Sequence, residues 1–370
     1  MTALSIPIST LIQYASTALL VLSVSYLLWR TLEQVMVQRR SYQQLPFGKP
    51  EPLEAGEDLV DCARAAMLGV ALGDALGMPR ESLPVWFANL RFGRSASLSR
   101  GIVRFMRRRG TISDDTQLTV ATARSVDDDG SYDAQRFQKQ LSRWTKYAIG
   151  PGRATMQAAR GWRRGEDRRD FDSQGNGAAM RVVPLAIAFR DEPERAIEAV
   201  RLNAAATHPN AEAIAGAEAM ARIVMWLLEL DGDAAVDANE LVETALPRTT
   251  SGEIEDWETR FRSAVSRNAD GGGLAAVGTT GWVKQTIPAV VYLLTRHAHD
   301  IEGALAELWA CGGDVDTNAA LYLACIGAWK GTRAFDAELI DSLQGAAVLA
   351  DEAARLAAIS FEAEESSRPA

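Results

Sequence analysis

The feature that most constrains the fold of this sequence is a helical pattern of apolar residues that continues from Asp58 almost to the C-terminus. Apolar side chains recur at helical spacing in stretches such as ARAAMLGVALGDALG and TIPAVVYLLTR, and no stretch alternates as a β-strand does. Helices rich in alanine and glycine can pack closely. We therefore expect an all-α protein whose residues 58–365 form one compact, single-domain helical bundle.

The N-terminal segment has a different composition. No charged side chain precedes Arg30, and the run from Leu11 to Trp29 is about as long as a helix that crosses a bilayer. It lacks the basic start and the small-residue end of a cleaved signal peptide. We expect a short tail over 1–10 and one transmembrane helix over 11–30, with a buried core helix as the alternative reading.

Basic residues occur only after this segment, which by the positive-inside rule places the rest of the chain in the cytoplasm. Residues 31–57, which contain several prolines, are then expected to form a juxtamembrane linker.

Charge and residue counts exclude several classes of function. The chain has 39 basic and 48 acidic side chains, a formal charge of −9, which argues against nucleic acid as a partner. It has only three cysteines and three histidines, and no two cysteines are close enough for a CxxC pair. A disulfide framework and a zinc site are therefore poorly supported, so any metal must be bound by oxygen atoms.

Three distant segments combine glycine or hydroxyl residues with acids, next to apolar helical stretches. They are GVALGDALGMPRE from Gly69, SDDT from Ser113 and GGDVDT from Gly312. Each one alone could be explained by helix capping. Taken together, such clustered carboxylates would repel one another without a cation, and oxygen ligands suit magnesium, manganese or calcium.

These segments, in this order and with GNGAAMRVVPLA from Gly175 and THPNAEAIAGAE from Thr207, resemble the ADP-ribosylglycohydrolase family. The resemblance extends from about Cys62 to Gly331. It implies an all-helical fold with two magnesium or manganese ions at the base of a cleft. Two features depart from the family pattern: Ser113 replaces a common threonine, and GPGRAT at 150–155 stands where many relatives have an acid.

The resemblance also implies roles for individual residues of this chain. The implied metal ligands are Ser113, Asp114, Asp115, Asp314, Asp316 and Thr317. The implied catalytic acids are Glu81 and Asp115. The implied substrate-binding residues are Gly175, Asn176, Gly177, Met180, Arg181, His208, Gly281 and Trp282.

The activity that follows from the resemblance is metal-dependent hydrolysis of the glycosidic bond between ADP-ribose and a modified protein side chain, with arginine as the expected acceptor. The expected partner is thus an ADP-ribosylated protein. Two alternatives stay open: a hydrolase of a free derivative such as O-acetyl-ADP-ribose, and a non-catalytic, immunity-like protein that binds ADP-ribose or a toxin.

A basic segment adds one more prediction. Seven arginines and no acid occur between Arg91 and Arg109. The segment could be a solvated surface or a rim that attracts ADP-ribose. We favour contact with anionic lipid, because the N-terminal anchor would hold the domain close to a membrane.

Overall fold

The computed structural model describes residues 8–45, 48–49, 58–81, 83–94, 109–248, 254–270 and 273–367. All regular elements in these residues are helices, with two isolated antiparallel bridges, so the expected all-α class is confirmed. The α-helices are α1 (Ile8–Gln44), α2 (Asp58–Gly77), α3 (Val85–Phe92), α4 (Asp114–Ala123), α5 (Ala134–Trp144), α6 (Arg153–Arg164), α7 (Val183–Ala188), α8 (Pro193–Ala205), α9 (Ala211–Glu229), α10 (Ala238–Ala245), α11 (Ile254–Asp270), α12 (Val283–Arg296), α13 (Ile301–Cys311), α14 (Val315–Lys330), α15 (Ala337–Asp341) and α16 (Ala346–Ser367). Short 3₁₀ turns lie at Ala179–Arg181, Leu274–Ala276 and Thr332–Ala334.

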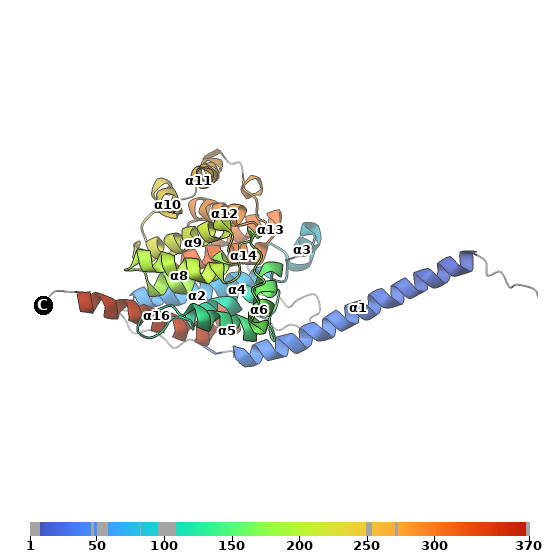
Figure 1. Ribbon diagram of the computed structural model, residues 1–370. Helices are drawn as coiled ribbons and strands as arrows, with labels where there is room; N and C mark the ends of the chain where they lie inside the picture. The colour runs from blue at the N-terminus through green and yellow to red at the C-terminus, as the bar shows by residue number, and fades with distance from the viewer. Residues whose placement is uncertain are drawn as a thin grey trace, which may run out of the picture.

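Helices α2 and α14 form a central pair inside the bundle (Figure 1). Glycines at every fourth position of α2 face α14: a Cβ on Gly73 would lie 2.3 Å from the carbonyl carbon of Ala319, and one on Gly77 would lie 2.3 Å from Cα of Asp316. The two backbones can approach this closely because glycine has no side chain. The glycine stripe therefore sets the position of the start of α14 relative to the end of α2.

The other helices surround this pair and bury most of their apolar side chains against it. The main core includes the large residues Trp257, Phe261, Tyr292 and Trp329, each 2% exposed or less. Helix α16 packs against α2, and helices α9 and α12 pack against α14. Since the central pair is covered on several sides, its polar residues are held in a rigid and largely dry environment.

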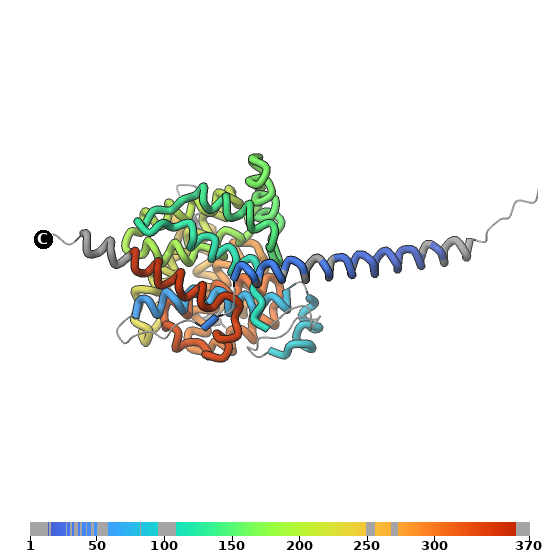
Figure 2. The backbone as a smooth tube through the Cα atoms, turned by 90° about the horizontal axis from the view of Figure 1, so that it is seen from below, coloured from blue at the N-terminus to red at the C-terminus, as the bar shows by residue number. Residues whose placement is uncertain are grey.

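Helix α1 extends away from the bundle as one long rod (Figures 1 and 2). It continues to Gln44, so the first part of the predicted linker, residues 31–44, is helical. The physical reason is that neither glycine nor proline interrupts the chain between Pro7 and Pro46. Its last turn joins the bundle, because Ser41 and Leu45 are 1% and 3% exposed.

Among the residues that the structure describes, no helix has both the length and the apolar character that crossing a membrane requires. The transmembrane assignment of residues 11–30 is therefore unsupported. The cytoplasmic location that we deduced from that assignment, and the domain boundaries, stay predictions.

Candidate active site

The acidic segments that are far apart in the sequence line one pocket of about 270 Å³. Its acidic wall contains Glu81, Asp114, Asp115, Asp314 and Asp316, together with the hydroxyl residue Thr317. The rest of the lining includes six of the predicted substrate-binding residues: Gly175, Asn176, Gly177, Met180, His208 and Gly281. The structure thus brings together most of the residues that the sequence singled out.

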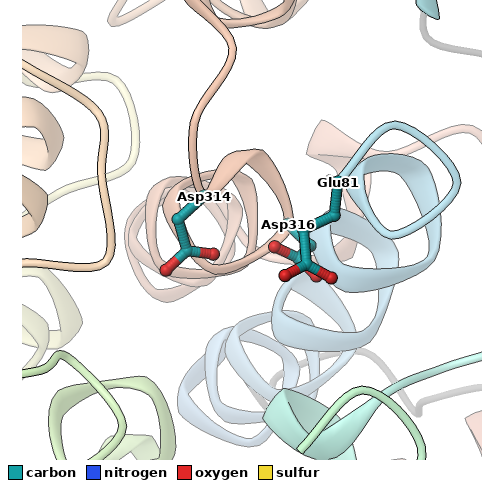
Figure 3. Close-up of side chains that lie close together, drawn as sticks. All are labelled: Glu81, Asp314 and Asp316. Atoms are coloured by element: carbon teal, nitrogen blue, oxygen red, sulfur yellow. The ribbon is translucent and has the colours of Figure 1, made fainter. Parts of the chain in front are cut away.

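Three of the carboxylates converge most tightly. One carboxylate oxygen from each of Glu81, Asp314 and Asp316 lies within 4.8 Å of the others, and Figure 3 shows these side chains facing one another. Glu81 is placed by the turn after α2, where its N–H donates to the carbonyl of Gly77 at 3.2 Å. Asp314 is placed by the start of α14. The close helix pair therefore brings the two ends into one acidic cluster.

The turn before α14 depends on two glycines. Gly312 and Gly313 have φ of 73° and 82°, in the left-handed region that favours glycine. A Cβ on Gly313 would also lie 2.5 Å from the carbonyl oxygen of Thr279. This turn leaves the Asp314 carboxylate free of the usual capping role and directed into the pocket, where Asn176 Nδ2 donates to it at 2.7 Å.

The start of α4 is capped from another helix. The Ser113 side chain makes no capping hydrogen bond. Instead, the buried carboxylate of Asp74 on α2 accepts from the Ser113 N–H at 2.8 Å, from the Thr116 N–H at 3.2 Å and from the Thr116 hydroxyl at 2.5 Å. These contacts satisfy helix N–H groups that would otherwise lack partners. Asp74 therefore positions the adjacent Asp114 and Asp115.

A hydrogen bond joins the two predicted half-sites directly. The Thr317 hydroxyl donates to Asp115 Oδ1 at 3.1 Å. On the other side of α4, the N–H of Gly152 donates to Asp114 Oδ2 at 3.3 Å. Each of these two adjacent acids is thus oriented by a contact from a different part of the fold.

The electrostatics of the acidic wall favour a bound cation. Burial raises the pKa of Asp114, Asp115 and Asp316 well above the usual value, and repulsion from neighbouring carboxylates adds to the rise in each pKa. Burial also raises the pKa of Asp74, against hydrogen bonds from Thr116 and the Ser113 backbone that lower it. A divalent cation would stabilise the charged forms, because it replaces mutual repulsion by attraction.

The donor set is consistent with such an ion. Glu81, Asp314 and Asp316 offer carboxylate oxygens, and Thr317 adds a hydroxyl in the same acidic wall. An oxygen donor set of this kind suits magnesium or manganese. Ser113 is buried and does not itself line the pocket.

The glycine-rich loop that lines the same pocket is held by main-chain pairing. Gly175 and Trp282 form an antiparallel bridge, and the Asn176 N–H donates to the carbonyl of Gly281 at 3.0 Å. There is no room for a side chain on Gly177, because its Cβ would lie 2.7 Å from the His208 ring. Glycine therefore allows the loop backbone to pack directly against the His208 ring.

Two predicted substrate-binding residues lie outside the pocket lining. The Trp282 side chain donates to Gln174 Oε1 at 2.8 Å, and its ring faces the Arg260 guanidinium at 4.7 Å. Arg181 is 0% exposed. Arg181 is thus fully buried and Trp282 is half-buried, and neither forms part of the pocket surface in this structure.

Arg181 begins a short series of hydrogen bonds that ends at His208. Its guanidinium donates to the Gly177 carbonyl at 2.6 Å and to the Thr207 hydroxyl at 2.8 Å, and that hydroxyl lies 2.8 Å from His208 Nδ1. The Thr207 hydroxyl can accept from Arg181 and also share a proton with Nδ1, so this series fixes the orientation of the His208 ring. Burial and the charge of Arg181 lower the His208 pKa to about 3, so the ring is neutral at the pocket.

Some pocket residues were missed from the sequence. Asp74 was not singled out, although it is the one acid inside the apolar stretch from Ala63 to Gly77, and that isolation is a usable signal. Asp170 also lines the pocket and lies 3.5 Å from Arg153, another lining residue. An acid is thus present near the position where GPGRAT lacks one, but it comes from a later segment. No short sequence pattern pointed to it.

The predicted arginine-rich segment lies mostly outside the described residues, since 95–108 are not among them. Its two ends make local contacts. Arg91 stacks on Phe92 at 5.2 Å, and Arg109 lies 3.6 Å from Glu338. The proposed contact with anionic lipid stays a prediction.

Comparisons with known proteins agree with this geometry. The family model for ADP-ribosylglycohydrolase matches residues 55–368, so the chain belongs to the ADP-ribosylglycohydrolase family. One relative is the ADP-ribosyl-(dinitrogen reductase) glycohydrolase of Rhodospirillum rubrum, 30% identical over 50% of this chain and 65% of its own length. Another is the ADP-ribosylarginine hydrolase Tri1 of Pseudomonas putida, 29% identical over 38% of this chain and 42% of its own length.

A solved structure shares the fold. It is described as an ADP-ribosylglycohydrolase-related protein complex, and it superposes with a TM-score of 0.61 at 24% identity, covering 82% of this chain and 99% of its own. The resemblance inferred from the motifs is thereby confirmed. Hydrolysis of ADP-ribose linkages is the activity class that family membership supports.

Proposed function

We propose that this protein is a metal-dependent hydrolase that removes ADP-ribose from a modified protein side chain, with arginine as the acceptor. The observation that carries the proposal is the convergence of Glu81, Asp314 and Asp316 in one pocket that also contains Asp114 and Asp115. A glycine-rich loop, which would bind the diphosphate, lines the same pocket. The acids and this loop together match a substrate that carries a ribose next to a diphosphate.

In this proposal the acidic wall holds two magnesium or manganese ions through Asp114, Asp115, Asp314, Asp316 and Thr317, with Glu81 and Ser113 beside them. When bound, such ions supply Lewis-acid chemistry at the ribose hydroxyls and at a water. The Thr317 hydroxyl and the Asn176 amide keep Asp115 and Asp314 in fixed orientations. Orientation of this kind reduces the reorganisation that a reaction would otherwise require.

The residues of the chain supply the remaining steps. Cleavage of an N-glycosidic bond passes through an oxocarbenium-like transition state, and carboxylates beside the ribose stabilise its positive charge. Glu81, at the pocket surface, accepts a proton from the attacking water and returns one to the departing group. His208 presents a neutral ring to the substrate and so adds no positive charge to the pocket.

Arginine as the acceptor is supported by two observations. One relative is named an ADP-ribosylarginine hydrolase. The pocket also contains Asp170, a carboxylate outside the acidic cluster that already accepts the guanidinium of Arg153 at 3.5 Å, so the same carboxylate suits a substrate guanidinium that displaces the exposed Arg153 side chain. No observation favours a free ADP-ribose ester as substrate. A purely binding protein is also not favoured, since binding alone does not require five carboxylates in one pocket wall.

The test is to incubate the full-length protein with ADP-ribosyl-arginine, ADP-ribosyl-serine and O-acetyl-ADP-ribose, with magnesium and then with EDTA. We expect magnesium-dependent release of ADP-ribose from the arginine conjugate. Release from another substrate alone would correct the acceptor. Tight binding of ADP-ribose without turnover of any of the three would contradict the enzymatic proposal.

A variant tests the site itself. The double substitution Asp314→Asn with Asp316→Asn should abolish release while the far-ultraviolet circular dichroism stays helical. The matched control is Asp127→Asn with Asp128→Asn, which changes two acids in a turn away from the pocket. Full activity of the Asp314/Asp316 variant would overturn the assignment of the acidic wall.

A further inference from the structure

A second cavity, of about 940 Å³, lies where the end of α1 meets α5 and the loop after α5. We propose that this cavity binds a ligand that carries phosphate groups. Its lining, which we call the basic cavity, consists of Arg40, Gln43, Gln44, Arg124, Arg136, Gln140, Arg143, Lys146 and Tyr147. None of these residues lines the catalytic pocket.

The lining of the basic cavity carries a surplus of positive charge. Arginine and lysine account for five of the nine lining residues, and no carboxylate is among them, in a chain whose formal charge is −9. Like charges that share one cavity repel one another, and an anion bound between them would replace that repulsion by attraction. The local surplus of positive charge thus indicates a negatively charged ligand.

Part of this charge is already compensated by the protein. Arg124 pairs with Glu352 at 2.9 Å, and Arg136 pairs with Asp127 and, at 3.6 Å, with Asp133. These partners lie outside the lining of the cavity.

The other three cations have no carboxylate partner within the described parts of the chain. Arg40 donates to the main-chain carbonyl of Lys146 at 3.4 Å, which leaves its charge uncompensated. The side chains of Arg143 and Lys146 are exposed and form no ion pair there. Three positive charges, from the end of α1, from α5 and from the loop after α5, are therefore available to one ligand.

The chemistry of the lining favours phosphate over a simple carboxylate. Guanidinium groups present paired N–H donors that match two oxygens of a phosphate, and lysine adds a point charge. Gln43, Gln44 and Tyr147 add neutral polar groups at the same surface. The cavity is more than three times as large as the catalytic pocket, at about 940 against 270 Å³, so it can hold more than one phosphate group.

The cavity also lies at a joint of the structure. The Ser41 hydroxyl on α1 accepts from Gln117 Nε2 at 2.7 Å, and Gln117 in turn contacts the carbonyl of Tyr147 at 3.2 Å. A ligand bridging Arg40 to Arg143 and Lys146 would hold α1 against this part of the bundle. We therefore expect the ligand to stabilise the junction, and its phosphate could belong to a soluble compound or to a lipid headgroup.

The test uses the full-length, metal-loaded protein, freed of unbound metal and saturated with ADP-ribose. Inorganic pyrophosphate is titrated in one arm, and phosphatidylcholine vesicles with and without phosphatidic acid are used in the other. The test variant is Arg143→Glu with Lys146→Glu. The matched control is Lys139→Glu with Arg160→Glu, which makes the same charge change at exposed residues of α5 and α6 outside the cavity.

We expect the test variant to lose affinity by about tenfold or more in at least one arm, because two charge-assisted contacts are reversed, and the control variant to bind like the wild type. Loss in the pyrophosphate arm identifies a soluble phosphate ligand, and loss in the vesicle arm alone identifies a lipid headgroup. Equal behaviour of the two variants in both arms, or no binding by the wild type in either, would overturn the proposal.

Discussion

Thr317 donates a hydrogen bond to Asp115 at 3.1 Å, although 202 positions separate the two residues in the chain. This contact joins the start of α14 to the start of α4 and fixes the distance between the two acidic half-sites. Both partners are buried, at 5% and 1% exposure, so the bond is protected from competition by water. The catalytic pocket therefore depends on the relative position of two helix ends.

We predict that Thr317→Val will weaken metal binding, because valine has the shape of threonine without the hydroxyl that orients Asp115. Loss of a residue that orients or binds a metal ligand typically lowers metal affinity or activity by about 10–100-fold. The measurement is the magnesium concentration at half-maximal release of ADP-ribose. Thr317→Ser, which keeps the hydroxyl, should stay close to wild type, and an unchanged magnesium requirement in the valine variant would refute the role.

A second prediction concerns Asp74, which caps α4 from outside. Asp74→Asn replaces one acceptor oxygen by an NH₂ group that faces the N–H donors of Ser113 and Thr116. We expect the free energy of unfolding to fall by about 1–3 kcal/mol, as for a buried donor left without its partner.

The control for this prediction is Asp129→Asn. Asp129 also accepts from a backbone N–H and a hydroxyl, both of Ser131, but it lies on the exposed surface. The control should change the free energy of unfolding by less than about 0.5 kcal/mol. Equal effects in a denaturant titration of both variants would show that burial of the Asp74 cap is unimportant.

The glycine stripe of α2 gives a third prediction. In Gly77→Ala the new methyl group would lie 2.3 Å from Cα of Asp316, so the helices must separate. We expect a loss of about 1–3 kcal/mol in stability together with a loss of activity, because Asp316 moves with the backbone of α14.

Gly152→Ala serves as the stability control, since its Cβ would meet only Thr155 Oγ1, at 4.0 Å. It should unfold at nearly the wild-type denaturant concentration. A Gly77→Ala protein of full stability and activity would show that the close approach of α2 and α14 is dispensable.

The fourth prediction is a dependence of stability on pH that comes from His208. Its pKa is about 3 in the folded protein, against an ordinary value of 6.5. Between these values the unfolded chain binds a proton that the folded chain does not, so stability falls as the pH falls from 6.5 towards 3. The slope from one such group is at most about 1.4 kcal/mol per pH unit.

In His208→Gln this contribution disappears. The measurement is the free energy of unfolding of both proteins at several pH values in that window, where other titrating groups contribute equally to each. The difference between wild type and variant should shrink as the pH is lowered. A difference that is constant with pH would mean that His208 is not held in the neutral form.

The sequence determined the secondary structure and the composition of the site. Helical periodicity alone predicted an all-α bundle, because apolar spacing is a local property of each helix. The acids Glu81, Asp114, Asp115, Asp314 and Asp316 could be found because each stands beside a glycine, a hydroxyl residue or a helix start. The absence of prolines and glycines from residues 8–45 was also visible, although we expected a linker after residue 30.

Only the tertiary structure decided how these parts act together. It assigned Asp74 to the cap of α4, left Arg181 and Trp282 outside the pocket lining, and brought Asp170 to the pocket from a segment without a recognisable motif. It also formed the basic cavity from α1 and α5, which no local pattern links. The physical reason is that these roles depend on distances between helices, and those distances are set by close packing such as that of Gly73 and Gly77 against α14.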